Sequence, residues 1–585
     1  MIELFIDENP ILLSSQAVIN IISRNPFLTK EGEFSFDIDI SLQVEENNRA
    51  YLNIDRINNT VDSKKNRAAV LYANGKLILT GTEVIMESSA SSVKIQILAG
   101  NSELNYKMRD VYIRNMDLGT FEFNPGDAAD ANVSATGPCC FPLVLVKDES
   151  ATILRNNFTR RYLVGPLFDL TPVGALPPVS ELVPQLYMGN AVVLILRALG
   201  YTVRQNVFST DERLKYLVVA NGNHTTRFNE MLPNMSVNDF ISIIEEAFSV
   251  YFSVDYTTRE IDIVRFDSYI QSRDPKRIEI LDDFVIANMD ENEVYTGYVF
   301  KDDGSNYHKR MILKDPDILK KERMEFSSFS NLVFSIEESG IENLYNANYL
   351  YYVREQDTHY YIAKENNRFI LSKIGVFTDT SEGEKRELSC VPCSCSWHTV
   401  DFRAVVENKP SWDVVWNTDI DMYVPLVTRT LNSTDQFIDD AVMNGIEKES
   451  KSDVIDTFFY TGERTLELHY GMSSLPTTYP FAFEDWTDCV CRAHSVDYSA
   501  KVYKWANMIF DYSRKLTFRP GEYANIIEEY IDNEKEYKFR VLGEDLNPDD
   551  IVNIRNKLFV CKETTSEYRE NTVERSAVFH ALKRN

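Results

Sequence analysis

"LPNMSVNDFISIIEEAFSVYFSVDYTTREIDIV" (232–264) holds a helix signal followed directly by a hairpin signal. Ser236 can accept a hydrogen bond at a helix N-terminus, and Asp239, three residues later, resembles the second member of a capping box. The apolar residues that follow recur at helical spacing and predict one apolar face: Phe240, Ile243, Ile244, Ala247 and Phe248. Such a stripe is typical of a core and not of a ligand site.

The second half of this stretch changes to a period of two. Apolar residues alternate with polar ones on both sides of a turn at 257–258: Phe252, Val254, Tyr256, Ile261 and Ile263. This alternation predicts two strands of a β-hairpin after the helix. An earlier helix is expected over 185–199, ending at Gly200-Tyr201 because glycine is favoured just past a helix C-terminus.

The N-terminal residues have strand periodicity. Phe34, Phe36, Ile38 and Ile40, with Leu42 after them, alternate with polar residues, so we expect these four side chains inside a closed or nearly closed β-barrel. Asn74-Gly75 accepts the positive φ angles of a type I′ turn and predicts a hairpin there. Val93, Ile95 and Ile97 mark a further strand.

These signals predict a β-rich α+β protein with several domains. We place the boundaries as follows: 1–123, N-terminal β-barrel-like domain; 124–183, turn- and proline-rich connecting segment, with a loop at 124–138; 184–280, helix-hairpin domain; 281–585, mixed and mostly β region. Within the last region we expect short helices at 314–325, 483–493 and 500–510, and final strands near 539–542, 551–554, 558–561 and 576–582.

The chain is strongly acidic. It has 61 Lys and Arg against 89 Asp and Glu, a net charge of −28. This opposes stable binding to DNA, which needs basic residues to displace phosphate counterions, and adhesion to anionic membranes. The acidity serves either solubility alone or a surface along which DNA slides without sticking.

Sequence features of secretion and membrane insertion are missing. The segment 1–7 has no basic n-region, and no stretch approaches ~18 consecutive apolar residues, so we expect neither a signal peptide nor a stable membrane span. The eight cysteines are accordingly expected to be thiols in a reducing cytoplasm.

The catalytic signatures that can be tested are absent. The sequence has no GxSxG, HExxH, GxxxxGK[ST] or GxGxxG motif, and its seven histidines are scattered. Carboxylates are abundant, but nothing in the sequence selects a glycosidase-like pair. We therefore expect no enzyme, and we assign no catalytic and no cofactor-binding residue.

One cysteine cluster has metal-ligand chemistry. Cys390, Cys393, Cys395 and His398 form C-x₂-C-x-C-x₂-H, and three thiolates with one imidazole can bind zinc. The alternative interpretation is three small buried hydrophobes in a strand-like segment. A second ligand pair is missing, because Cys489 and Cys491, on an expected helix, would point about 200° apart. We therefore expect no metal.

Three segments in a fixed order carry a family resemblance. They are "NPFLTKEGEFSFDIDISLQVEENNRAYLNIDRINN" (25–59), "PQLYMGNAVVLILRALGYTVRQNVF" (184–208) and the stretch 232–264, with the Asn74-Gly75 hairpin and the strand 93–106 between them. Over about residues 1–280 the chain resembles the hub proteins of phage tails, meaning the tail-associated protein of siphophages and the baseplate hub of myophages. The N-terminal part is similar to large tail proteins from phages of gut bacteria.

The resemblance implies a trimer in the virion tail, assembled in the host cytoplasm. Each chain would carry two tube-like β-barrels, the second within 281–585, with the helical unit between them. Three chains would form a pseudo-sixfold ring that contacts the tail tube, distal tail, tape-measure and fibre proteins, with DNA present only in transit. No lysozyme-like extension precedes the last residue, Asn585, so no wall-degrading activity is expected. Alternatives are a hexameric distal tail ring protein, a host-surface carbohydrate-active enzyme and a receptor-binding adhesin.

Overall fold

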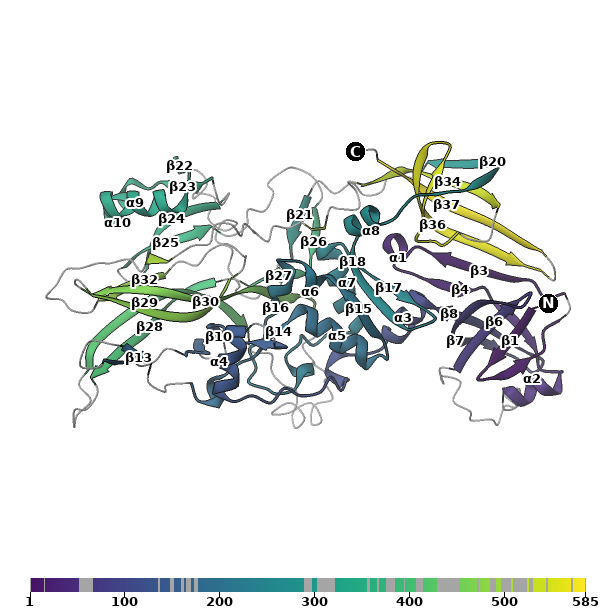
Figure 1. Cartoon of the computed structure of the whole chain (residues 1–585), viewed down its shortest axis with the longest axis horizontal. Helices are drawn as coiled ribbons and strands as arrows, with labels where there is room; N and C mark the ends of the chain where they lie inside the picture. The colour runs from purple at the N-terminus through teal and green to yellow at the C-terminus, as the bar shows by residue number, and fades with distance from the viewer. Residues whose placement is uncertain are drawn as a thin grey trace, which may run out of the picture.

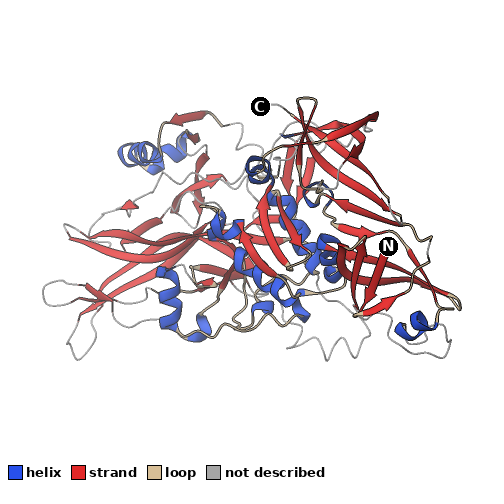
Figure 2. Ribbon diagram, turned by 45° about the vertical axis from the view of Figure 1, so that its right-hand side comes forward, coloured by secondary structure: helices blue, strands red, loops and turns tan. Residues whose placement is uncertain are grey.

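Strands dominate both ends of the chain and helices gather in its middle (Figure 2). The computed structural model describes residues 2–14, 16–51, 67–134, 137–147, 152–158, 162–164, 170–172, 177–288, 297–301, 321–354, 358–365, 368–374, 385–393, 395–406, 414–428, 452–470, 473–483, 491–495, 507–508, 523–524, 530–542, 546–569 and 572–583. The expected fold class, a β-rich α+β protein with several domains, is confirmed.

The largest sheet has 14 strands and draws them from both ends of the chain. The N-terminal strands are β1 (Ile2–Ile6), β2 (Asn9–Ile11), β3 (Ile19–Arg24), β4 (Glu33–Ser35), β5 (Ile38–Ser41), β6 (Arg67–Ala73), β7 (Lys76–Ser88) and β8 (Ser92–Ala99). The later strands are β19 (Lys276–Arg277), β20 (Glu279–Asn288), β34 (Ile531–Leu542), β35 (Ile551–Ile554), β36 (Lys557–Tyr568) and β37 (Val573–Leu582). The four expected C-terminal strands are therefore confirmed.

This sheet consists of two curled halves joined edge to edge (Figure 1). Its order is β2-β1-β6-β7-β8-β4-β3-β36-β37-β34-β20, and β3 pairs with β36 at the junction. Each half encloses its own core, around Leu4, Ile40 and Ile95 in the first and around Phe559 and Phe579 in the second. Within the described residues no pairing joins β2 to β3, so the first half is a half-barrel and not a closed barrel.

The predicted hairpin at Asn74-Gly75 is confirmed. Ala73 lies opposite Lys76, so the loop has two residues, and their φ angles are 53° and 75°. Positive φ at both central positions is the type I′ requirement that the Asn-Gly pair satisfies at low cost.

The single strand expected through Phe34 and Phe36 is wrong. From Phe34 to Ile38 the chain takes four steps, while its partner β8 takes three, from Leu98 to Ile95. The extra residue is a bulge that moves the side chains to the opposite face. Ile38 and Ile40 lie in the core as expected, but Phe34 is half-buried and Phe36 is 46% exposed.

The helical middle follows the sequence closely. Helices α5 (Met188–Ala198) and α7 (Val237–Phe248) pack in one core with the hairpin β17 (Val250–Asp255) and β18 (Glu260–Arg265), which β15 (Thr202–Asn206) extends. The Ser236 hydroxyl accepts a hydrogen bond from Asp239 N at 3.0 Å, and Gly200 has φ 89°, so both predicted helix ends are confirmed. Residues 185–187, expected in the first helix, instead form strand β14 (Gln185–Tyr187).

The remaining elements surround this middle. The helices are α1 (Pro26–Thr29), α2 (Glu45–Ala50), α3 (Gly100–Met108), α4 (Pro125–Ser134), α6 (Val207–Thr210), α8 (Phe266–Ser272), α9 (Phe329–Ser339) and α10 (Ile341–Ala347). A small sheet of β22 (Arg323–Phe326), β23 (Leu350–Val353), β24 (Thr358–Glu365) and β25 (Arg368–Ile374) packs on α9 and α10. A two-stranded sheet pairs β21 (Gly297–Phe300) with β26 (Lys385–Leu388).

Two seven-stranded sheets complete the structure. One contains β10 (Val144–Lys147), β11 (Thr152–Arg155), β12 (Tyr162–Val164), β13 (Leu170–Pro172), β28 (Cys395–Val406), β29 (Val414–Thr428) and β32 (Cys491–Ser495). The other contains β9 (Cys139–Cys140), β14, β16 (Leu217–Val219), β27 (Cys390–Pro392), β30 (Ile455–Tyr470), β31 (Ser473–Phe483) and β33 (Asn507–Met508).

The loop expected at 124–138 is wrong in part, because 125–134 is helix α4. Asn124 accepts hydrogen bonds from the backbone N–H groups of Gly126 and Asp127, and Pro125 takes the first helical position. Asn-Pro therefore starts a helix here, since proline's missing N–H is not needed at that position.

Three helices expected after residue 300 are contradicted where the structure describes them. Residues 323–326 form β22, 491–495 form β32 and 507–508 form β33, while 314–320, 484–490 and 500–506 lie outside the described residues. Pairing with β29 and β30, distant in sequence, outweighs the local helical pattern in the second and third cases.

The two halves of the sheet and the helical middle meet at one joint. The Asn25 amide donates to Cys561 O at 2.8 Å, and its oxygen accepts from Phe27 N at 3.0 Å. Phe27 stacks on Tyr269 of α8, with ring centroids 3.9 Å apart. Nearby, Lys30 Nζ lies 3.2 Å from the buried carboxylate of Glu245 on α7.

Phe248→Ala tests the helix stripe. Phe248 has no exposed surface and its ring contacts that of Phe208, with centroids 5.5 Å apart. We expect the variant to lose roughly 3–5 kcal/mol of stability through lost burial and a cavity, measured by thermal or urea unfolding. Phe334→Ala, which removes a phenylalanine that is 59% exposed on α9, is the matched control. Equal stability of the two variants would show that the stripe is not core.

Glu245→Gln tests the buried charge at the joint. Burial raises the pKa of the Glu245 carboxyl from 4.5 to about 7, although Lys30 lowers it in part. Folding therefore favours the protonated acid, and this contribution is present below pH 4.5 and lost as the pH rises through 7. The wild type should lose on the order of 2–3 kcal/mol relative to Glu245→Gln between pH 5 and 8. Glu342→Gln, at an exposed position on α10, should keep the wild-type pH profile.

Candidate functional site

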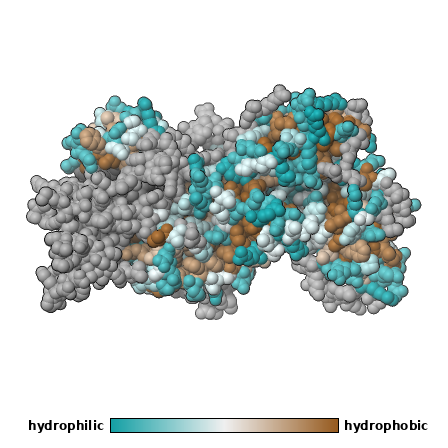
Figure 3. Space-filling view, viewed as in Figure 1, coloured by the Kyte–Doolittle hydropathy of each residue, from teal (hydrophilic) through white to brown (hydrophobic). Residues whose placement is uncertain are grey.

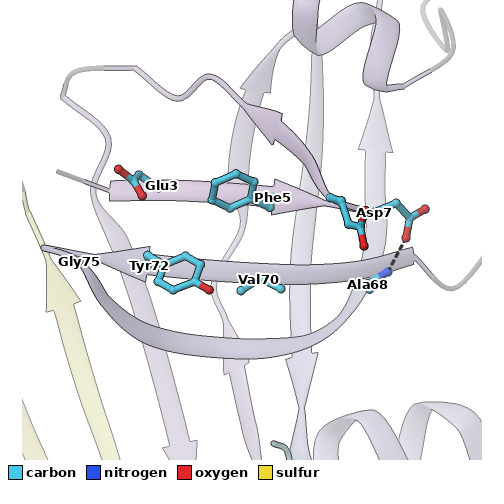
Figure 4. Close-up of a pocket in the computed structure, with 8 residues that line it drawn as sticks. Glu3, Phe5, Asp7, Ala68, Val70, Tyr72 and Gly75 are labelled. Carbon is cyan, nitrogen blue, oxygen red and sulfur yellow. Dashed lines mark hydrogen bonds between the residues drawn. The ribbon is translucent and has the colours of Figure 1, made fainter.

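The outer face of β1 and β6 carries a hollow of about 850 Å³. Its lining residues, which define the β1–β6 hollow, are Glu3, Phe5, Asp7, Glu8, Ala68, Val70, Tyr72 and Gly75 (Figure 4). The Phe5 and Tyr72 rings meet edge to face, with centroids 6.0 Å apart, and form an apolar floor. Three of the eight residues are acidic, so the hollow offers apolar surface with a negative rim.

Strand alternation places these side chains. Leu4 and Ile6 are buried in the core beneath the sheet, so Glu3 and Phe5, between and beside them, project from the opposite face. The alternation of Glu3, Phe5 and Asp7 with apolar residues is visible in the sequence, but only the pairing of β1 with β6 brings Tyr72 and Val70 beside them.

The turn between β1 and β2 supports the rim in a strained conformation. Asp7 and Glu8 have φ angles of 44° and 67°. Asp tolerates this left-handed region, as Asn and Gly do, whereas Glu adopts it at a cost of roughly 1–2 kcal/mol. Asp7 gains a hydrogen bond in return, because its carboxylate accepts from Ala68 N at 2.9 Å. Glu8 is exposed, and its side chain makes no hydrogen bond or ion pair within the described residues.

The other end of the same sheet, at strand β20, exposes large apolar side chains. β20 is the last strand, and no described strand pairs with its outer edge. Its large apolar residues are exposed to solvent and define the β20 edge: Leu281 at 36%, Phe284 at 47%, Val285 at 62% and Ile286 at 48%. Figure 3 shows apolar atoms at the upper right, where Figure 1 places β20 and β34.

Basic side chains accompany this edge. Val285 lies opposite Lys538 of β34, and Arg540, two residues farther on, shares the same outer face. Lys538 and Arg540 are both exposed, and Arg540 lies 3.6 Å from Glu574. Phe284 and Ile286 point to the other face, where Phe284 contacts the ring of Phe539 at 6.0 Å between centroids.

The cysteine cluster divides between two cores. Cys390 is buried with the helical middle, whereas Cys393 is buried in the separate core around Phe458 and Tyr460. Burial raises the pKa of the Cys390 thiol to about 12, which opposes the thiolate that a metal needs. Cys395 and His398 lie on β28, and their side chains are outside the described residues. Cys139 and Cys140 divide between the same two cores.

Two features are absent from the part of the chain that the structure describes. In that part, no group of three or more His, Cys, Asp and Glu side chains is arranged to hold a metal ion. None of the described helices is both long enough and apolar enough to cross a membrane.

Comparisons with known proteins add little information on the family or function of this chain. No family model matches the sequence, and no curated protein matches it. A structural comparison aligns the chain with the crystal structure of the 43 kDa tail protein of prophage MuSo2 from Shewanella oneidensis, at a TM-score of 0.31 and 8% identity, over 99% of this chain and 97% of that one. Likeness at this level assigns neither a fold nor a function.

The expected absence of metal from Cys390, Cys393, Cys395 and His398 stays a prediction with a direct test. Elemental analysis of the purified protein should find no stoichiometric zinc, because buried thiols in two separate cores cannot share an ion. A chelator should leave the unfolding temperature unchanged. One equivalent of zinc whose removal lowers that temperature would contradict the prediction.

Proposed function

We propose that the chain is a structural protein of a phage tail, located at the hub where the tube meets the baseplate, and that its copies form a ring around a channel for DNA. The observation that carries this proposal is the open 14-stranded sheet, whose two curled halves end at β2 and β20, strands whose outer edges pair with no strand among the described residues. Because the two end regions of this sheet differ, one end region of a copy can contact the other end region of the next copy, and such head-to-tail contacts generate a ring when the rotation closes.

A trimer fits this sheet best. Three copies supply six curled halves, which matches the pseudo-sixfold ring that the resemblance of residues 1–280 to tail hubs implies. Six copies, as in a hexameric distal tail ring, would supply twelve curled halves, which is twice the number that a pseudo-sixfold ring needs. The chain has no catalytic role in this proposal, and its partners are the tube, distal tail, tape-measure and fibre proteins.

The acidic composition suits a channel protein. Each chain carries a net charge of −28, so three chains carry three times that, −84. A wall without basic patches lets DNA leave quickly, because every phosphate held by Lys or Arg slows its passage. In this proposal DNA is present only in transit, the protein inserts in no membrane, and it is assembled in the host cytoplasm and functions in the virion tail.

Sedimentation equilibrium of the purified chain tests the ring. A trimer has a mass of about 202 kDa and a hexamer about 404 kDa, three and six times the 67.4 kDa of the chain. Antibody labelling of phage particles in electron micrographs should mark the end of the tail distal to the capsid. A chain that is monomeric in solution and single in the particle, or a label on the capsid, would contradict the proposal.

A further inference from the structure

We infer that the β1–β6 hollow of one copy receives the β20 edge of a second copy. This inference rests on the proposed ring and names the surfaces that would form it. The two surfaces lie at opposite ends of one sheet, so each copy presents one of each (Figure 1). Contacts between two different surfaces are head-to-tail, which is the arrangement that closes a ring.

The part of the β20 edge that follows Asp282 and Asp283 lacks the protection that edge strands usually have. Proteins guard such edges with charges, proline or short length, since an exposed apolar edge invites pairing with another chain. β2, at the other end, is guarded: it has three residues, and Pro10 offers no N–H. The run from Phe284 to Ala287 has no charge, no proline and four exposed side chains in succession, so a partner is expected to cover it.

The two surfaces are complementary in charge. Glu3, Asp7 and Glu8 surround the apolar floor of the hollow, whereas the exposed Lys538 lies directly opposite Val285. Insertion of Val285 over Phe5 and Tyr72 would bury apolar surface on both copies and bring opposite charges together at the rim.

The turn between β1 and β2 is a further observation that points to a partner at the acidic rim. The chain uses Asn74-Gly75 where a hairpin needs positive φ angles, yet Asp7 and Glu8 occupy the same kind of turn. The hydrogen bond from Ala68 N explains why an Asp occupies position 7, but no contact among the described residues explains why a Glu occupies position 8. The two-residue turn between β1 and β2 needs positive φ angles, but it does not need a Glu, and residues held in such unfavourable backbone conformations concentrate at binding sites. A basic partner at the rim explains why Glu8 is kept there.

Two variants, each with one blocked end, test the inference. Glu3→Lys combined with Glu8→Lys reverses the charge of the hollow, and Val285→Asp places a charge on the edge; all three positions are exposed, so folding should be unaffected. Each variant alone should associate roughly 100-fold more weakly than the wild type, because docking would bury an unpaired charge. Circular dichroism and unfolding temperature establish that each variant is folded.

Mixing the two variants gives the sharper result. The intact edge of one should dock in the intact hollow of the other, which leaves two blocked ends. The mixture should therefore form a 1:1 dimer of about 135 kDa, twice the chain mass, and nothing larger. Val133→Asp on α4, where the side chain is 70% exposed, and Glu342→Lys on α10 are matched controls that should assemble like the wild type.

The outcomes separate this inference from the proposed function. Blocked variants that still form the wild-type ring would overturn the inference and leave the ring intact. Variants that are monomeric alone and also fail to form a dimer when mixed would likewise overturn it, because the two surfaces then do not meet. A wild type that is monomeric at its highest soluble concentration and single in the particle would overturn the ring itself.

Discussion

The pairing of β3 with β36 is the constraint on which the rest of the structure depends. Residues 19–24 lie opposite 563–568, so the first and last parts of the chain form one sheet. Closing so long a loop costs entropy, and side-chain contacts at the junction offset it. Arg24 Nε donates to Glu563 at 2.8 Å, and the Asn25 amide donates to Cys561 O. Without this junction the two curled halves would be separate sheets with four free edges.

Joining the halves also determines where the free edges lie. Each half loses one edge at the junction, which leaves β2 at one end and β20 at the other. The Phe27–Tyr269 stack and the Lys30–Glu245 pair hold the helical middle against this junction, so both ends of the sheet extend from the same packed joint. Surfaces fixed in this way meet a second copy without reordering, and association then loses less conformational entropy.

Local signals predicted the parts of the fold that are local. The α7 helix and its hairpin, the Gly200 stop and the Asn74-Gly75 turn all depend on contacts within a few residues, and each was predictable. The bulge before Ile38 was not predictable, because the extra residue is recognised only when this segment is compared with its partner strand β8. The hollow was half predictable: β1 shows its alternation in the sequence, but Tyr72 joins Phe5 only through strand pairing. The β20 edge was not predicted, since the position of a strand in its sheet depends on pairing partners that are distant in sequence.

Charge repulsion explains why association needs such specific surfaces. The buried carboxylates of the described residues are Glu83, Glu103, Glu245 and Asp550, and each has a basic partner within 3.2 Å. The interior is therefore nearly neutral, and most of the −28 charge faces solvent. Two such chains repel each other at long range. Attraction must come from a place where a basic side chain lies beside exposed apolar surface, and Val285 with Lys538 provides one at the open end of the sheet.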